Sequence, residues 1–175
     1  MSDISALQSK FNDLIEEQRK LNEKFQKDAQ DIFRKTLRAF FEKNPGINAL
    51  VWTQYTPYFN DGDTCEFSVN DVSFTNATSE DDLNQINYDE YEGENSDIWV
   101  ASNLSHVFEN AHKNWYKETV EKIKAGPPID LQSCDFISEM IPSTDMEDVM
   151  EAMFGDHVKV IATREGFDVQ EYEHD

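Results

Sequence analysis

Three carboxylates lie close together in the stretch NDGDTCEF: Asp61, Asp63 and Glu66. Clustered acids of this kind hold the divalent metals of metal-dependent hydrolases, usually with a Lys beside the scissile phosphate. Here the chain has no Lys or Arg from Asn44 to His112, whereas it has thirteen Asp or Glu. Asp61 and Asp63 also flank the glycine of an Asp-Gly turn, where Asp is favoured for backbone reasons. We interpret these acids as turn residues and keep a metal-dependent hydrolase as an alternative.

Two Glu-x-x-His pairs, Glu109 with His112 and Glu171 with His174, have the spacing of di-metal ligands. Di-metal bundle proteins place two such pairs on core helices and add two further Glu. The second pair here falls in the C-terminal tail, and short pairs of this kind arise easily in a Glu-rich chain. The sequence also has no nucleophile elbow, Walker loop or Gly-x-Gly-x-x-Gly turn. We therefore expect no catalytic residues, no metal ligands and no cofactor.

The two cysteines, Cys65 and Cys134, have no basic neighbour in sequence that would lower a thiol pKa. We expect both to be inert thiols in a reducing compartment, with a bridge between them as the alternative. No apolar run approaches eighteen residues, and the first residues lack the apolar region of a signal peptide. The expected location is therefore the cytoplasm, without a membrane partner.

The net charge of −21 is spread unevenly along the chain. Residues 1–47 carry nine basic and eight acidic residues, whereas residues 48–175 carry six basic and twenty-eight acidic residues. Such a field repels nucleic acid, whose binding depends on Lys and Arg, and attracts basic protein surfaces. We expect a basic protein surface as the partner and no direct nucleic-acid binding. The alternative is that the charge only keeps the protein soluble.

Residues 1–43 are predicted to contain one long helix, which ends before Pro45. Its first half has apolar residues at the heptad spacing of a coiled coil, with Gln18 inside the stripe. The pattern fails at Asp28 and widens into a face suited to packing on a body. We predict a projecting first half that forms homo-oligomers through Ile4, Leu7, Phe11, Leu14, Leu21 and Phe25. The alternative is pairing with the chain's own second helix.

Residues 44–175 are predicted to form a single acidic α+β domain. Alternating apolar residues predict strands over 47–58 and 64–75, joined at an Asp-Gly hairpin turn. The alternation changes parity near Asn70 and Asp71, which predicts a bulge or a tight bend. Residues 76–97 are polar and acidic, and are predicted to be a flexible loop. The remaining predicted elements are a short strand over 97–102, helices over 103–124 and 143–154, and a terminal hairpin turning near 164–166.

The first strand and the acidic loop supply the candidate partner-binding residues. The aromatic side chains near the strand end are Trp52, Tyr55 and Tyr58. They form either part of the core or an exposed aromatic patch with an acidic rim, a composition typical of binding hot spots. The candidate acids are Asp81, Asp82, Asp89, Glu90 and Glu92.

The stretch WTQYTPYFNDGDTCEFSVND resembles a segment of small, uncharacterised acidic proteins of tailed bacteriophages and some bacteria. The resemblance covers about 20 of the 175 residues and implies a phage or bacterial intracellular protein. It implies no catalytic residues. By analogy, a small acidic phage protein without catalytic motifs suits an inhibitor that blocks a basic groove.

The expected fold is α+β, with a long N-terminal helix, a small antiparallel sheet of hairpins and further helices packed on one face. The expected function is a non-enzymatic protein-binding module, such as a phage inhibitor of a host nuclease, restriction factor or protease. The first alternative is a structural or assembly protein that oligomerises through the N-terminal helix. The second is the metal-dependent hydrolase.

Overall fold

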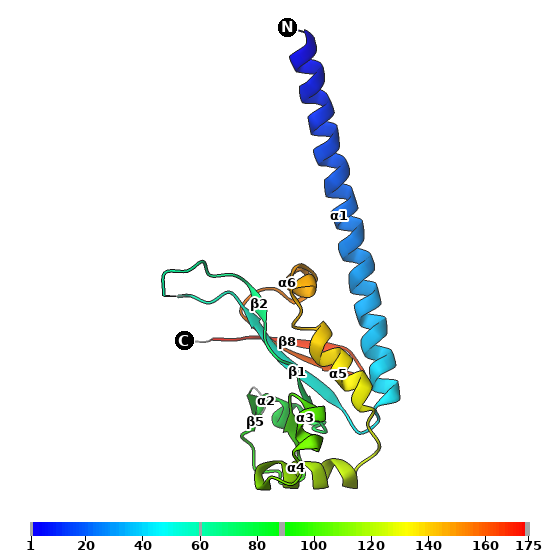
Figure 1. Cartoon of the computed structure of the whole chain (residues 1–175), viewed down its shortest axis with the longest axis vertical. Helices are drawn as coiled ribbons and strands as arrows, with labels where there is room; N and C mark the ends of the chain where they lie inside the picture. Colours follow the sequence, from blue (N-terminus) through cyan, green and yellow to red (C-terminus); the bar gives the residue numbers. More distant parts are fainter. Residues whose placement is uncertain (1, 60, 88–89, 174–175) are drawn as a thin grey trace. The chain divides into compact units, whose positions relative to one another are not determined.

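The computed structural model describes residues 2–59, 61–87 and 90–173. The chain divides into two compact units, one ending at Thr36 and the other running from Leu37 to the C-terminus. Helices and an antiparallel sheet are both present, so the predicted α+β fold is confirmed (Figure 1).

A single helix, α1 (Ser2–Lys43), forms the N-terminal part of the chain, as predicted. It contains no Gly or Pro and is rich in Glu, Lys, Arg and Gln, which are good helix formers. Arg19 pairs with Glu16 and Glu23, one turn away on either side, which adds local support. The helix ends immediately before Asn44 and Pro45.

The last turn of α1 is fixed by a distant arginine. The Nη2 atom of Arg164 donates to the carbonyl oxygens of Phe41 (3.2 Å) and Asn44 (3.1 Å). Its guanidinium also lies 5.5 Å from the centre of the Phe41 ring. The free carbonyls at a helix end carry partial negative charge, so a cation there is stabilising.

The described residues contain one six-stranded antiparallel sheet, with β1 at its centre (Figure 1). Along the sheet the order is β6-β3-β1-β7-β8, and β2 pairs with the far end of β1 beside β3. The strand bounds are β1 (Ala49–Tyr55), β2 (Ser68–Val69), β3 (Ser73–Thr75), β6 (Val100–Ala101), β7 (Val158–Thr163) and β8 (Phe167–Glu171). The predicted terminal hairpin is β7 with β8, closed by a hydrogen bond from the Thr163 N–H to the Gly166 carbonyl.

The predicted bulge lies between β2 and β3. Val51 pairs with Ser73, but three residues later Gln54 pairs with Val69, so the returning chain holds one extra residue. Asn70 lies in this bulge and donates from its side chain to the Thr53 hydroxyl (2.8 Å). The predicted hairpin is present, because β1 pairs antiparallel with β2 and a turn with positive φ lies at Asp61 and Gly62. The strands are shorter than predicted, since residues 56–59 and 61–67 lie outside them.

One face of the sheet packs on helices. The Trp52 ring lies 5.6 Å from the ring of Phe154 in α6 (Glu147–Phe154). Gln54 is fully buried and donates to the carbonyls of Met150 (3.0 Å) and Gly155 (2.6 Å). Its oxygen accepts from the Trp52 indole N–H (3.2 Å), so the amide nitrogen and the amide oxygen both have hydrogen-bond partners.

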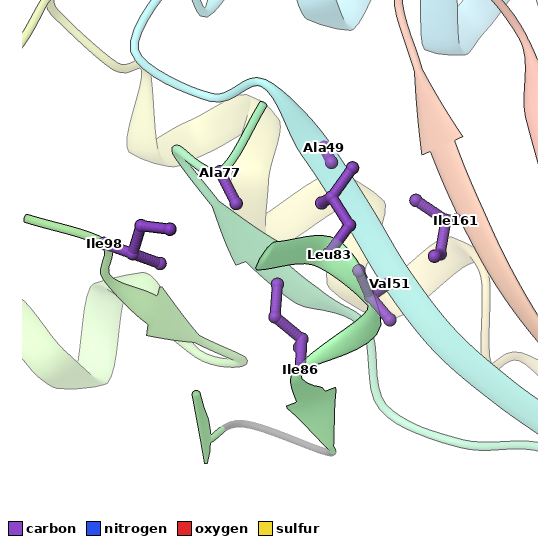
Figure 2. Close-up of a cluster of buried hydrophobic side chains, with 7 residues drawn as sticks. All are labelled: Ala49, Val51, Ala77, Leu83, Ile86, Ile98 and Ile161. Carbon is purple, nitrogen blue, oxygen red and sulfur yellow. The ribbon is translucent and has the colours of Figure 1, made fainter. Parts of the chain in front are cut away.

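The opposite face is covered by the acidic segment that was predicted to be a flexible loop. This segment forms α2 (Glu80–Asn84) and a small hairpin of β4 (Ile86–Asn87) with β5 (Glu90–Tyr91). Figure 2 shows Leu83 and Ile86 directed onto the sheet, where they join a buried cluster. The other members are Ala49, Val51, Ala77, Ile98 and Ile161. The loop prediction is wrong because these few apolar residues are enough to bury one side of the segment.

The helix predicted over 103–124 is two helices, α3 (Leu104–Glu109) and α4 (Asn114–Ala125). The break follows from Asn110, whose side-chain amide donates to the His106 carbonyl (2.9 Å) and ends α3. The helix predicted over 143–154 is confirmed as a short 3₁₀ turn, η1 (Thr144–Met146), followed by α6.

A further helix, α5 (Leu131–Met140), has no counterpart in the sequence prediction. Its first turn is capped by Asp130, whose carboxylate accepts from the Ser133 N–H (2.9 Å) and from the Lys43 ammonium (2.7 Å). Asn44 lies at the same place, where α1 ends and α5 begins, and has no exposed surface. Its side chain donates to the Phe40 carbonyl and the Ser133 hydroxyl, and accepts from the Asp130 N–H.

Candidate functional site

The acidic segment is held in a defined conformation by its own side chains. Ser79 caps α2 by accepting from the Asp82 N–H (3.1 Å), and its hydroxyl donates to the Asp82 carboxylate (2.6 Å). The other oxygen of that carboxylate accepts from the Tyr91 hydroxyl (2.6 Å). The bonds from Ser79 and Tyr91 lower the pKa of Asp82, so it remains a carboxylate at neutral pH.

A lysine from the sheet fixes the end of α2. The Lys159 ammonium donates to the carbonyls of Leu83 (3.3 Å), Asn84 (3.4 Å) and Ile86 (2.6 Å). Burial lowers the pKa of Lys159, because the charged form loses solvation there. The side-chain amide of Gln170 in β8 adds a bond to the Asn84 side chain (2.7 Å). The acidic residues of α2 therefore lie on a helix whose end is held in place by hydrogen bonds.

A pocket of about 430 Å³ lies between α2 and the β7–β8 hairpin. We call it the acid-rimmed pocket, because its lining includes the carboxylates Glu80, Glu165 and Asp168, all of which are exposed. Apolar lining comes from Leu83 and Ile161, and the remaining lining residues are Thr78, Thr163, Gly166 and Phe167. The ring of Phe167 lies 4.9 Å from that of Phe154 in α6, so it is directed to the other face of the sheet. Carboxylates around apolar surface suit the long, partly apolar side chain of Lys or Arg.

The predicted partner-binding acids have different roles in the structure. Asp81, Glu90 and Glu92 are exposed, so they are free to meet a partner surface. Asp82 is half-buried, and both its oxygens are used within the segment. Asp89 lies outside the described residues. Asp81, Asp82, Glu90 and Glu92 do not line the acid-rimmed pocket, although they lie on the same segment as Glu80.

The three predicted aromatic residues do not form one exposed patch. Trp52 is only 2% exposed and packs in the core, so its prediction as a partner-contacting residue is wrong. Its side chain lies on the face of β1 that packs on α6. Side chains on both faces of β1 are buried, so neither face is exposed to a partner. Tyr55 is half-buried, with its ring 5.8 Å from that of Tyr172. Tyr58 is 68% exposed.

Tyr58 is supported by a hydrogen-bonded corner. Its ring stacks on His157 at 4.8 Å between ring centres. The neighbouring Asp156 accepts from the Thr56 N–H and hydroxyl (both 2.7 Å) and from the His157 N–H (2.8 Å). Partial burial raises the pKa of Asp156, but the bonds from Thr56 and His157 outweigh this and lower it overall.

We expect Asp156→Asn to lower the free energy of unfolding by about 1–2 kcal/mol at pH 7, because an amide cannot accept all three bonds. The folded-state pKa of Asp156 lies below its unfolded value, so this stabilisation is present above roughly pH 4. It is lost as the pH falls through the folded pKa. Urea titrations of wild type and variant at pH 7 and pH 2 measure the difference, with Glu139→Gln as the control. A difference that does not shrink with acid contradicts the assignment.

The second candidate site is the apolar stripe on the N-terminal unit. All six residues predicted to mediate oligomerisation are between 62% and 73% exposed. We call Ile4, Leu7, Phe11, Leu14, Leu21 and Phe25 the α1 stripe. Ile15, next to the stripe, is 51% exposed. Contiguous apolar surface of this extent marks an interaction site.

The described residues considered for metal or nucleophilic chemistry do not line the acid-rimmed pocket. Asp61, Asp63 and Glu66 are exposed in the connection between β1 and β2. Among the residues that the structure describes, no three His, Cys, Asp or Glu are grouped to hold a metal. His112 is exposed, and His174 lies outside the described residues.

Both cysteines are free thiols, so the alternative of a bridge between Cys65 and Cys134 is excluded in this structure. Burial raises the pKa of Cys134 to about 12, which keeps it protonated at neutral pH. Cys65 is half-buried in the connection between β1 and β2.

Comparison with protein-family models, curated proteins and solved structures found no match to this chain. Within the described ranges, no helix combines the length and the apolar character needed to cross a bilayer.

The sequence did not indicate the acid-rimmed pocket. Its rim residues Glu80, Glu165 and Asp168 come from segments about eighty residues apart in the chain. Only the pairing of α2 with the β7–β8 hairpin brings them together. The one available signal was the apolar pair Leu83 and Ile86, which marks the acidic segment as packed against a sheet.

Proposed function

We propose that this chain is a non-enzymatic protein-binding module whose acidic body binds a basic protein surface. The observation that carries this proposal is the acid-rimmed pocket, in which carboxylates from two distant segments surround apolar surface. A Lys or Arg side chain fits such a site, with its aliphatic part against Leu83 and its charge at the rim.

The charge of the surrounding surface supports the same partner chemistry. The body from Leu37 onward carries twenty-nine acidic and eight basic residues. Two of those basic side chains form hydrogen bonds within the chain. Lys159 donates to carbonyls at the end of α2, and Arg164 donates to carbonyls at the end of α1. The field of the body therefore speeds encounter with a basic surface, and the pocket fixes the docked position.

Two further proposals follow the resemblance to acidic phage proteins. The partner is a host protein with a basic groove, such as a nuclease, restriction factor or protease. The protein acts in the host cytoplasm by occupying that groove.

The proposed function is tested by capture from bacterial lysate with three baits. The first is the wild type, and the second replaces the pocket rim by Glu80→Gln, Glu165→Gln and Asp168→Asn. The third is a matched control that removes three exposed acids elsewhere, by Glu109→Gln, Glu139→Gln and Glu151→Gln. All captured proteins are identified by mass spectrometry at low and high salt.

We expect the wild type and the control to capture one stoichiometric basic protein, and the rim variant to lose it. With the purified partner, the rim variant should reduce the association rate roughly tenfold at low salt, because steering depends on local charge. High salt should weaken binding of the wild type, since exposed charges are screened within about 10 Å at 0.1 M. Equal capture by all three baits counts against the pocket as the binding site.

A second candidate function is a structural or assembly protein that oligomerises through α1. The specific observation in its favour is the α1 stripe, which remains exposed along the first half of a 42-residue helix. Heptad spacing of large apolar residues is typical of helices that pair with other helices.

A further inference from the structure

The charges beside the α1 stripe distinguish between two ways of pairing two copies of the helix. Lys10 and Glu17 are exposed, lie on the same side of the stripe and are separated by one heptad. When the heptad is written abcdefg with the stripe at positions a and d, Lys10 and Glu17 occupy g positions. In a coiled coil these positions lie next to the contact between the helices, where charges select the partner orientation. The e positions on the other side hold Ile15 and Asn22, which carry no charge.

Pairing in the same direction places g residues opposite e residues of the second copy. Lys10 then faces Ile15, and Glu17 faces Asn22, so neither charge gains a partner. Pairing in opposite directions places g residues opposite g residues. Lys10 of each copy can then face Glu17 of the other, which gives two equivalent ion pairs across the seam.

Asp28 gives a second, independent distinction. It occupies a stripe position one heptad after Leu21. When helices pair in the same direction and in register, each stripe residue meets its own counterpart, so two Asp28 carboxylates would face each other across the seam. In opposite directions, with Lys10 facing Glu17, the two Asp28 residues lie about 46 Å apart along the helices, so their carboxylates do not face each other.

The charges of the two units also favour pairing in opposite directions. Residues 1–36 carry seven basic and seven acidic residues, so the helix region itself does not repel a second copy. Residues 37–175 carry a net charge of −21. Same-direction pairing attaches two such bodies at the same end of the paired helices. Opposite-direction pairing separates the two attachment points by about 70 Å along the helices, many times the screening length.

We propose that the α1 stripe binds a second copy of this chain in the opposite direction. In this arrangement Phe11 packs against Leu14, Leu7 against Gln18 and Ile4 against Leu21 of the second copy, and Phe25 pairs with no residue of the stripe. This inference rests on the second proposed function, assembly through α1, and adds the partner, its direction and its register.

The orientation is tested by disulfide trapping with two single variants, Ile4→Cys and Leu21→Cys. Both also carry Cys65→Ser, while Cys134 is buried and stays in place. Light scattering first checks that each variant still associates. Each variant alone, and an equal mixture of the two, is then oxidised mildly and separated by mass.

We expect no disulfide dimer from either variant alone, because each new cysteine lies about 26 Å along the helix from its own counterpart. The mixture should form the mixed disulfide between position 4 and position 21, up to about half of the chains from statistical mixing. That result supports the opposite direction and the register together.

The other outcomes separate the possible failures. Disulfide dimers from each variant alone, without the mixed species, show same-direction pairing and overturn the orientation while leaving assembly intact. A wild type that associates, with no disulfide in any arm, overturns the register. A wild type that is monomeric overturns both the orientation and the assembly function, and leaves the stripe to a different protein.

Discussion

Replacing Leu14 and Leu21 together by Lys should convert the associated protein into a monomer at micromolar concentration. Both residues are more than 60% exposed in the single chain, so their substitution removes little packing within the monomer. Each buried Leu contributes roughly 1.5–3 kcal/mol, and a dimer loses four of them. The association constant should therefore fall by about four orders of magnitude or more.

Light scattering and sedimentation measure this change. The matched control is Ser9→Lys with Asn12→Lys, which adds the same charge to the same helix away from the stripe. The control should remain associated, and both variants should keep the helical circular dichroism of the wild type. A wild type that is already monomeric at these concentrations refutes the prediction, as does a control that dissociates equally.

Asn44→Ala should lower the free energy of unfolding by about 3 kcal/mol, the largest effect that we expect from a single polar residue. Asn44 has no exposed surface, and its side chain bonds to the Phe40 carbonyl, the Ser133 hydroxyl and the Asp130 N–H. Alanine leaves these groups without that partner in a buried corner, and each unsatisfied group costs roughly 1–3 kcal/mol.

Urea denaturation followed by fluorescence measures the loss, and Asn114→Ala on the exposed surface of α4 is the control. Because Asn44 belongs to a buried hydrogen-bond network, we expect Asn44→Asp to be destabilising as well. A carboxylate cannot donate to the Phe40 carbonyl. A change below about 0.5 kcal/mol in Asn44→Ala would show that the corner relaxes around the smaller side chain.

Sequence periodicity was enough to predict the elements with strong patterns. The terminal hairpin and the bulge after β2 follow from apolar spacing, because one face of each strand has to be buried. The first half of α1 follows from its good helix formers and heptad spacing, although its apolar stripe is exposed. The bulge is the clearest case, since the parity change at Asn70 and Asp71 corresponds to the register shift opposite Val51 and Gln54.

The incorrect predictions come from segments whose structure depends on contacts distant in sequence. Residues 76–97 have the average composition of a loop, but Leu83 and Ile86 pack on β1 and β7, and Lys159 holds their carbonyls. Trp52 was ambiguous because a strand with two apolar faces does not indicate which side chains reach the surface. The acid-rimmed pocket could not be predicted from the sequence, because the residues of its rim come together only after the chain has folded.

The central position of β1 has a consequence for how the protein is made. Its longest pairing partner is β7, which the ribosome adds about a hundred residues after β1. Until that segment leaves the exit tunnel, one edge of β1 has unsatisfied backbone groups and can pair with other nascent chains. Completion of the sheet is therefore expected after translation has passed residue 171, and not progressively from the N-terminus. Premature termination anywhere before β7 should give an aggregating product, which a chaperone holding the open edge would suppress.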